Sequence, residues 1–177
     1  MYNQVVGQFT FDQRKALEVI LFISKKIPDL YHILKILYFA DRKHLQEYGR
    51  FICGDSYVAM NNGPVPSEVY DMIKHVRGDG TIFKSEYDSL MKEFSINGNN
   101  IIPLREPNLE LLSESDIKCL ENSINENQLL TFEQLKSKSH DTAYKSADEN
   151  DFISVENIAK SLEDGDKLID YLQNMYK

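Results

Sequence analysis

Asp41 and His44 are the first pair of side chains in the sequence that could carry out chemistry together. They stand three positions apart in a segment of helical periodicity, so both lie on one face of the same helix. A carboxylate and an imidazole in this arrangement can bind a metal ion or transfer a proton, but two ligands are too few for a metal site. The same face carries leucines, so we expect both side chains to be buried and hydrogen-bonded. We therefore predict a structural polar network of Asp41, His44, Arg50 and Asp55 that joins the helix to the segment after it.

Cys53, His140 and Asp141 occur in the order of nucleophile, base and orienting acid found in some cysteine hydrolases. A reactive thiol usually lies at a helix N-terminus or beside a cation, whereas Cys53 opens a segment of turn composition. A buried packing role suits this cysteine better, and we expect His140 to anchor a loop between two helices or to contact a partner. The sequence contains no metal-ligand cluster, P-loop or dinucleotide-binding glycine pattern. We predict a protein that is not an enzyme and has no catalytic residue, metal or cofactor.

A proline-containing stretch after a β-favouring run is the remaining candidate for function. Residues 61–66 are predicted to form an irregular loop, because two prolines remove backbone donors and restrict φ, and Ser67 is placed to cap the next helix. Two interpretations stay open: a rigid turn that sets the entry of the helix, or a stiff recognition surface that loses little entropy on binding. In the second, the predicted partner-binding residues are Asn62, Gly63, Pro64, Val65, Pro66, Ser67, Glu68, Tyr70 and His140.

Two N-terminal helices are predicted to position these residues. Thr10 and Gln13 have the spacing of a capping box, and apolar residues recur at helical period from there until Pro28. The next predicted helix, over about 29–48, is apolar on nearly every side of its central part. Such a helix belongs in the middle of the fold.

Residues that favour β-structure interrupt the helical pattern twice. Phe51-Ile52 and the run 57–60 flank a turn composition, so we predict that they form a short hairpin or a small sheet. A second hairpin is predicted around Asn97-Gly98-Asn99, and it could extend the same sheet. The residues from 84 to 92 fit neither pattern.

The last third of the sequence is predicted to be helical again. Ser113 with Asp116, and Thr131 with Gln134, have capping-box spacing, and further helices are predicted over 154–162 and about 166–176. The predicted fold class is mainly α (α+β): a compact multi-helix domain with a small antiparallel β-sheet or hairpin inserted between helices. We expect residues 1–177 to form this one domain.

The overall composition limits the classes of partner. Among 177 residues, 20 Lys and Arg stand against 28 Asp and Glu, a net charge of −8, which argues against direct binding of nucleic acid. The two cysteines are typical of a reduced cytoplasmic protein rather than of a secreted disulfide scaffold. The opening, Met1 to Thr10, has neither the basic flank and apolar core of a signal peptide nor the length of a membrane span. We expect a cytoplasmic protein that does not bind a membrane.

Several motifs, in order along the chain, resemble those of the Panacea (SocA-like) antitoxin domain. They are KILYFAD at 35–41, YGR at 48–50, GD at 54–55, YVAM at 57–60, GPVPSEVYD at 63–71 and SH at 139–140. The most specific of them is the Gly-Pro-Val-Pro-Ser-Glu block that follows the Tyr-Val-Ala-Met run. The resemblance extends over roughly 12–147, which is most of the chain.

This resemblance implies an antitoxin of a bacterial or phage toxin–antitoxin pair, of the kind found in prophages and phage defence. Its partner would be a separately encoded cognate toxin, which it would neutralise by direct protein–protein binding. Two alternatives remain open. The chain could be a proteolytic adaptor that delivers a toxin to a ClpXP-type protease, as the resemblance to one branch of the family implies, or an enzyme that uses Asp41, His44 and His140.

Overall fold

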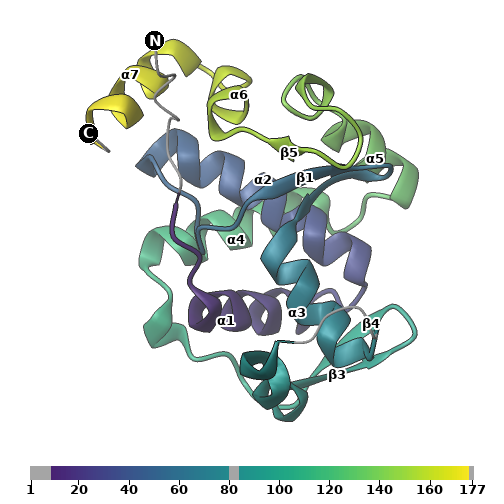
Figure 1. Ribbon diagram of the computed structural model, residues 1–177. Coiled ribbons are helices and arrows are strands. Elements are labelled where there is room, and N and C mark those ends of the chain that lie inside the picture. The colour runs from purple at the N-terminus through teal and green to yellow at the C-terminus, as the bar shows by residue number, and fades with distance from the viewer. Residues whose placement is uncertain (1–8, 80–83, 176–177) are drawn as a thin grey trace.

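The computed structural model describes residues 9–79 and 84–175, so most of the opening segment Met1 to Thr10 lies outside the described residues. Helices form most of the structure, and two small antiparallel sheets lie among them (Figure 1). The prediction of a mainly α chain with a small sheet is confirmed. Helix α2 (Leu30–Tyr48) runs through the middle, with α1 (Gln13–Ser24) and α7 (Gly165–Met175) on opposite sides of it (Figure 1).

Helix α2 is buried on nearly every side, as its apolar sequence predicts. The consecutive side chains at 35–38 are at most 1% exposed, although successive residues of a helix point in different directions around it. Helix α4 (Glu114–Asn127) packs along α2. The other elements are therefore placed against this central helix.

Helix α1 begins with a different cap from the predicted one. Asp12 is the N-cap, because its carboxylate accepts a hydrogen bond from the Lys15 N–H at 3.0 Å. The Thr10–Gln13 capping box is wrong, since Asp12 is still extended and its own N–H donates to the Cys53 carbonyl at 2.9 Å. A contact from a later segment therefore decides where this helix starts.

The larger sheet has three strands in the order β2-β1-β5. β1 (Tyr57–Met60) pairs antiparallel with β2 (Gly63–Pro66) through a tight turn, and β5 (Phe152–Ile153) pairs with the other side of β1. Two predictions are therefore wrong: Phe51-Ile52 is not the partner of β1, and the proline-containing stretch is a strand rather than an irregular loop.

The prolines fit this strand because β2 is an edge strand. The Ser67 N–H donates to the Ser56 carbonyl at 2.8 Å, so every second residue of β2 faces β1. Pro64 and Pro66 occupy the alternate positions, where the backbone faces away from β1 and no N–H is needed.

The hairpin predicted around Asn97-Gly98-Asn99 is confirmed, but it forms a separate sheet. β3 (Phe94–Asn97) and β4 (Asn100–Pro103) pair antiparallel with each other. The Leu30 N–H donates to the Asn99 carbonyl at 2.8 Å, which holds the hairpin against the start of α2. The ambiguous segment before it is a 3₁₀ helix, η1 (Ser85–Lys92).

The helices of the last third are confirmed together with their caps. Both predicted capping boxes, Ser113 with Asp116 and Thr131 with Gln134, have both of their hydrogen bonds. The remaining elements are α3 (Ser67–Arg77), η2 (Leu109–Leu111), α5 (Phe132–Ser139), η3 (Tyr144–Ser146) and α6 (Val155–Lys160).

The buried apolar side chains form two clusters, and α2 contributes to both. Ile36 belongs to the larger cluster, shared with α1, α3 and α4, whereas Tyr38 belongs to the cluster shared with α6 and α7. Within residues 9–79 and 84–175, no helix is both long enough and apolar enough to cross a membrane.

Candidate functional site

Asp41 lies at the centre of a buried polar network beneath the β1–β2 hairpin. Its side chain is fully buried, and it accepts a hydrogen bond from the Ile52 N–H at 2.6 Å and another from the Tyr57 hydroxyl at 2.7 Å. Burial raises the pKa of this carboxyl to about 7, although the two hydrogen bonds act in the opposite direction. Asp41 therefore ties α2 both to the segment after it and to β1.

His44 and Arg50 form a second part of the network, around the start of α4. The His44 ring contacts the Arg50 carbonyl through Nδ1 at 2.9 Å, and through Nε2 it contacts Ser115 at 2.9 Å and Asp116 at 3.2 Å. Arg50 and Lys15 also pair with Asp116, at 2.9 and 2.6 Å. Burial would raise the pKa of Asp116, but the hydrogen bonds from His44 and Lys15 outweigh it and hold this pKa below its ordinary value. This carboxylate therefore joins α1, α2 and α4.

Asp55 has a different role from the other predicted members of the network. Its carboxylate accepts hydrogen bonds from the Glu68 N–H at 3.0 Å and the Val69 N–H at 2.8 Å, so it caps α3 from a distant segment. The prediction that Ser67 caps this helix is wrong: the N-cap position is Pro66, which supplies no side-chain hydrogen bond. Burial raises the pKa of Asp55 to about 6.

The predicted partner-binding segment is mostly buried. All four residues of β2 are buried, and only the turn before it, at Asn61 and Asn62, is exposed. Side chains from two helices hold alternate carbonyls of the hairpin: Tyr31 binds Asn62 O at 2.8 Å, Lys35 binds Pro64 O at 2.7 Å, and Tyr144 binds Met60 O at 2.9 Å. β2 therefore sets the shape of the hairpin tip rather than presenting its own side chains.

Gly63 lets the hairpin approach α2 and α5 closely. Its φ of 105° is in the region that favours glycine, and a Cβ there would lie 2.5 Å from Ser139 Oγ and 3.0 Å from Lys35 Nζ. The tip of the hairpin reaches α5 for this reason (Figure 1).

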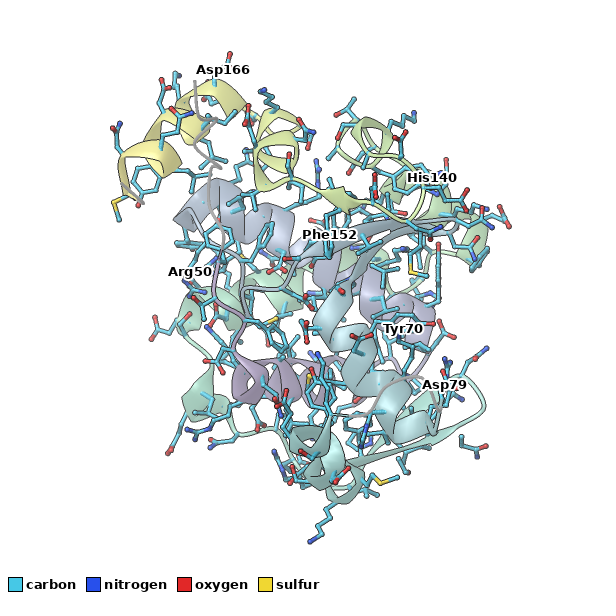
Figure 2. The ribbon with its side chains drawn as sticks, viewed as in Figure 1. Arg50, Tyr70, Asp79, His140, Phe152 and Asp166 are labelled. Carbon is cyan, nitrogen blue, oxygen red and sulfur yellow. The ribbon has the colours of Figure 1, made fainter. Side chains whose placement is uncertain are left out.

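His140 ends α5 and lies beside the hairpin tip (Figure 2). Its ring stacks on Tyr144, with centroids 4.1 Å apart and planes at 21°. The Nε2 atom is enclosed and is the one buried side-chain polar atom of the described chain without a hydrogen-bond partner. Burial lowers the pKa of His140, and the positive charges of Lys136, Lys35 and Lys145 lower it further.

The structure thus brings Asn62 and His140 together on one surface. Around them lie two aromatic pairs, since Tyr31 also packs on Phe132 with ring centroids 4.3 Å apart. We call this the hairpin-tip surface, and its residues are Tyr31, Asn62, Phe132, His140 and Tyr144.

Glu68 and Tyr70 belong to another part of the molecule. Glu68 binds Lys84 at 2.7 Å and the Tyr87 hydroxyl at 2.9 Å, and Tyr70 lies on α3 under Lys74, whose Nζ is 4.8 Å from the ring centroid. In Figure 2, Tyr70 lies well away from His140. Glu68 is thus not a freely projecting charge.

Replacing Glu68 with lysine should therefore affect stability as well as any surface contact. We expect the free energy of unfolding to fall by about 1 kcal/mol, because a partly exposed ion pair is lost and the buried Tyr87 hydroxyl loses its acceptor. The melting temperature should fall by about 2–4 °C. Thermal unfolding measures the effect, with Glu68→Gln, which keeps an acceptor, as the milder control. An unchanged melting temperature for Glu68→Lys would show that these contacts contribute nothing.

The catalytic arrangements considered from the sequence are not assembled. Cys53 is 2% exposed, and burial, followed by the charges of Asp41 and Asp55, raises the pKa of its thiol well above the ordinary value. Asp141 binds Tyr38 at 2.8 Å and Arg42 at 3.0 Å rather than orienting His140 towards a thiol. Within the described residues, no group of three histidine, cysteine or acidic side chains is placed to hold a metal.

Four contributors to the hairpin tip were missed from the sequence: Tyr31, Lys35, Phe132 and Tyr144. Lys35 carried a signal, because it is a lysine inside an apolar helical run and its side chain is only 1% exposed. Burial lowers its pKa to about 7. The three aromatic residues carried no signal, because partly buried aromatics at these spacings are common in helical proteins.

Comparison with known proteins identifies a family for this chain. A family model described as antitoxin SocA-like, Panacea domain, matches residues 33–145, which is more than half of the chain and includes most of α2, the β1–β2 hairpin and His140. No curated protein and no solved structure matches.

Proposed function

The chain belongs to the SocA-like Panacea antitoxin family, and we propose that it neutralises a cognate toxin by binding it directly through the hairpin-tip surface. The family match is the observation that carries the proposal. It supports an antitoxin role, and the surface is our inference from the side chains around Asn62 and His140. Both cysteines are free and buried, which supports action in the cytoplasm.

The hairpin-tip surface has the features of a protein-binding site. Tyrosine and phenylalanine are enriched at interfaces because they bury a large area and lose little side-chain entropy. Phe132 is 41% exposed, although its ring packs on Tyr31. The hydrogen bonds to alternate carbonyls keep the hairpin in place, so little ordering is needed when a partner binds.

Replacing Phe132 with alanine should weaken toxin binding at least about tenfold, because an aromatic side chain near the centre of an interface often dominates its energy. Phe152→Ala is the matched control: Phe152 is 65% exposed and lies away from His140 (Figure 2). The measurement is co-purification and titration with the small protein encoded next to this chain, whose expression alone should arrest growth. Equal binding of the toxin by both variants would show that the interface does not include Phe132.

Neutralisation by binding also predicts the fate of the toxin. The amount of toxin in rescued cells should stay constant, because a blocked toxin persists in the complex. Rescue of growth without any complex at micromolar concentrations would contradict the proposal, as would rescue that depends on protease-driven loss of the toxin. The second result would identify an adaptor.

A further inference from the structure

Three lysines without an ion pair surround one histidine. Most lysines and arginines in the described part of the sequence pair with a carboxylate, and Lys35, Lys136 and Lys145 are three of the six that do not. The charges of all three disfavour protonation of His140, and the charge of Asp141 favours it more weakly. The Asp141 carboxylate is itself paired with Arg42 at 3.0 Å. The charge around His140 is therefore positive, although the whole chain carries −8.

The fold brings the residues that carry these side chains to the region of the hairpin tip. Lys136 and His140 are one helical turn apart in α5, where the His140 N–H donates to the Lys136 carbonyl at 3.0 Å. Lys145 follows Tyr144, on which the His140 ring stacks. Lys35 lies below them, almost fully buried against the Pro64 carbonyl, and because burial lowers its pKa to about 7, it adds only part of a positive charge at neutral pH.

The net charge of the sequence, taken alone, favours a partner with a basic surface. A net charge of −8 suits a basic patch on the toxin. The unpaired lysines instead create a local positive field, and complementarity between local patches governs encounter and selectivity at an interface. A polyphosphate is a poor occupant, because it needs an extended basic track and would be repelled by the rest of this acidic chain.

We propose that four residues, Lys136, His140, Tyr144 and Lys145, bind an acidic segment of the partner protein. Asp or Glu carboxylates of that segment pair with Lys136 and Lys145. The partner's identity as a toxin rests on the proposed function, but the chemistry of the segment does not. We call these four residues the lysine–histidine surface. The surface overlaps the hairpin tip at His140 and Tyr144, so one partner can cover both.

An oligoglutamate peptide is the probe for this surface, with an oligolysine peptide of the same length as its counterpart. Titration of the full chain with oligoglutamate should shift the His140 ring signals in NMR to saturation, and oligolysine should leave them in place. The variant Lys136→Glu/Lys145→Glu should bind oligoglutamate at least tenfold more weakly. Lys26→Glu/Lys92→Glu makes the same change of charge at two exposed lysines elsewhere, and its binding should stay within about twofold of wild type.

Several results would overturn the inference. The first is that oligoglutamate does not shift the His140 ring signals. The second is that both double variants lose the same amount of affinity for oligoglutamate. The third is that a single-stranded oligonucleotide of equal charge binds more tightly than oligoglutamate. Thermal unfolding checks that both double variants fold. If Lys136→Glu/Lys145→Glu does not fold, Lys136→Gln/Lys145→Gln replaces it, because this variant removes the charges without reversing them.

Binding of the toxin separates this inference from the proposed function. If the toxin binds wild type and Lys136→Glu/Lys145→Glu equally well, while Phe132→Ala loses it, the acidic-segment inference fails and the proposed function stands. If no variant and no wild-type chain binds the toxin, the proposed function fails, and the peptide titration alone decides the chemistry of the surface.

Discussion

Replacing Asp41 with alanine should lower the free energy of unfolding by about 3 kcal/mol or more, the largest effect expected of any single substitution considered. The change leaves the Ile52 N–H and the Tyr57 hydroxyl without an acceptor in a fully buried place, and each stranded donor costs about 1–3 kcal/mol. Urea unfolding at about pH 7.5 measures the loss.

Asp41→Asn is the matched control for this substitution. Its side-chain oxygen still accepts from the Ile52 N–H, and its amide can donate to the Tyr57 oxygen, so most of the stability should remain. An unchanged unfolding free energy for Asp41→Ala, together with loss of neutralisation, would contradict a structural role. It would place this carboxyl in a functional contact instead.

Stability should pass through a minimum near neutral pH. The folded pKa of Asp41, about 7, lies above its ordinary value of 3.8, so between these values the folded chain holds a proton that the unfolded chain has lost. Stability therefore falls as the pH rises from about 5 to 7, and Asp55, with a pKa raised to about 6, adds to this fall. His140, whose pKa is lowered, opposes it more weakly because its ring is nearer to the surface.

Lys35 produces the rise on the alkaline side. Its folded pKa of about 7 lies below its ordinary value of 10.5, so between these values the unfolded chain binds the extra proton and stability increases with pH. The free energy of unfolding should fall by about 2 kcal/mol over about pH 5–7, the acid limb of the profile, and rise by about 2 kcal/mol over about pH 7–9, the alkaline limb. Urea unfolding across this range measures both.

Two variants assign the limbs to their residues. Asp41→Asn should reduce the acid limb to the part that Asp55 contributes and leave the alkaline limb, whereas Lys35→Met should remove the alkaline limb and leave the acid one. A profile that stays flat from about pH 5 to 9 would show that neither group titrates near neutrality in the folded chain, and a rise over this range without a preceding fall would contradict the raised pKa of Asp41.

Much of the helical framework could be predicted because its determinants are local. The capping boxes at Ser113 and Thr131 are confirmed, since a cap and the N–H groups that it binds lie within three residues. The burial of Asp41 and His44 is confirmed for a similar reason: both continue an apolar stripe on α2. The need for buried partners followed from that burial, although the partners themselves did not.

Errors arose where a distant segment supplied the partner. Ser67 has the composition of a cap, yet Asp55 caps α3 because the backbone folds back past it. The prolines of β2 suggested a loop, but they lie where an edge strand needs no N–H. The same fold buries Val65 and leaves Asn62 exposed, which reduces the predicted contact segment to its tip.

The sequence by itself determined the order of the helices, the burial of Asp41 and His44 on α2 and the family to which the chain belongs, because these depend on periodicity and on motifs read along the chain. Only the tertiary structure decided that His140 lies beside the hairpin tip and that unpaired lysines surround it. The physical reason is distance along the chain. Tyr144 binds the carbonyl of Met60 across 84 positions, and no local pattern encodes a hydrogen bond between η3 and β1.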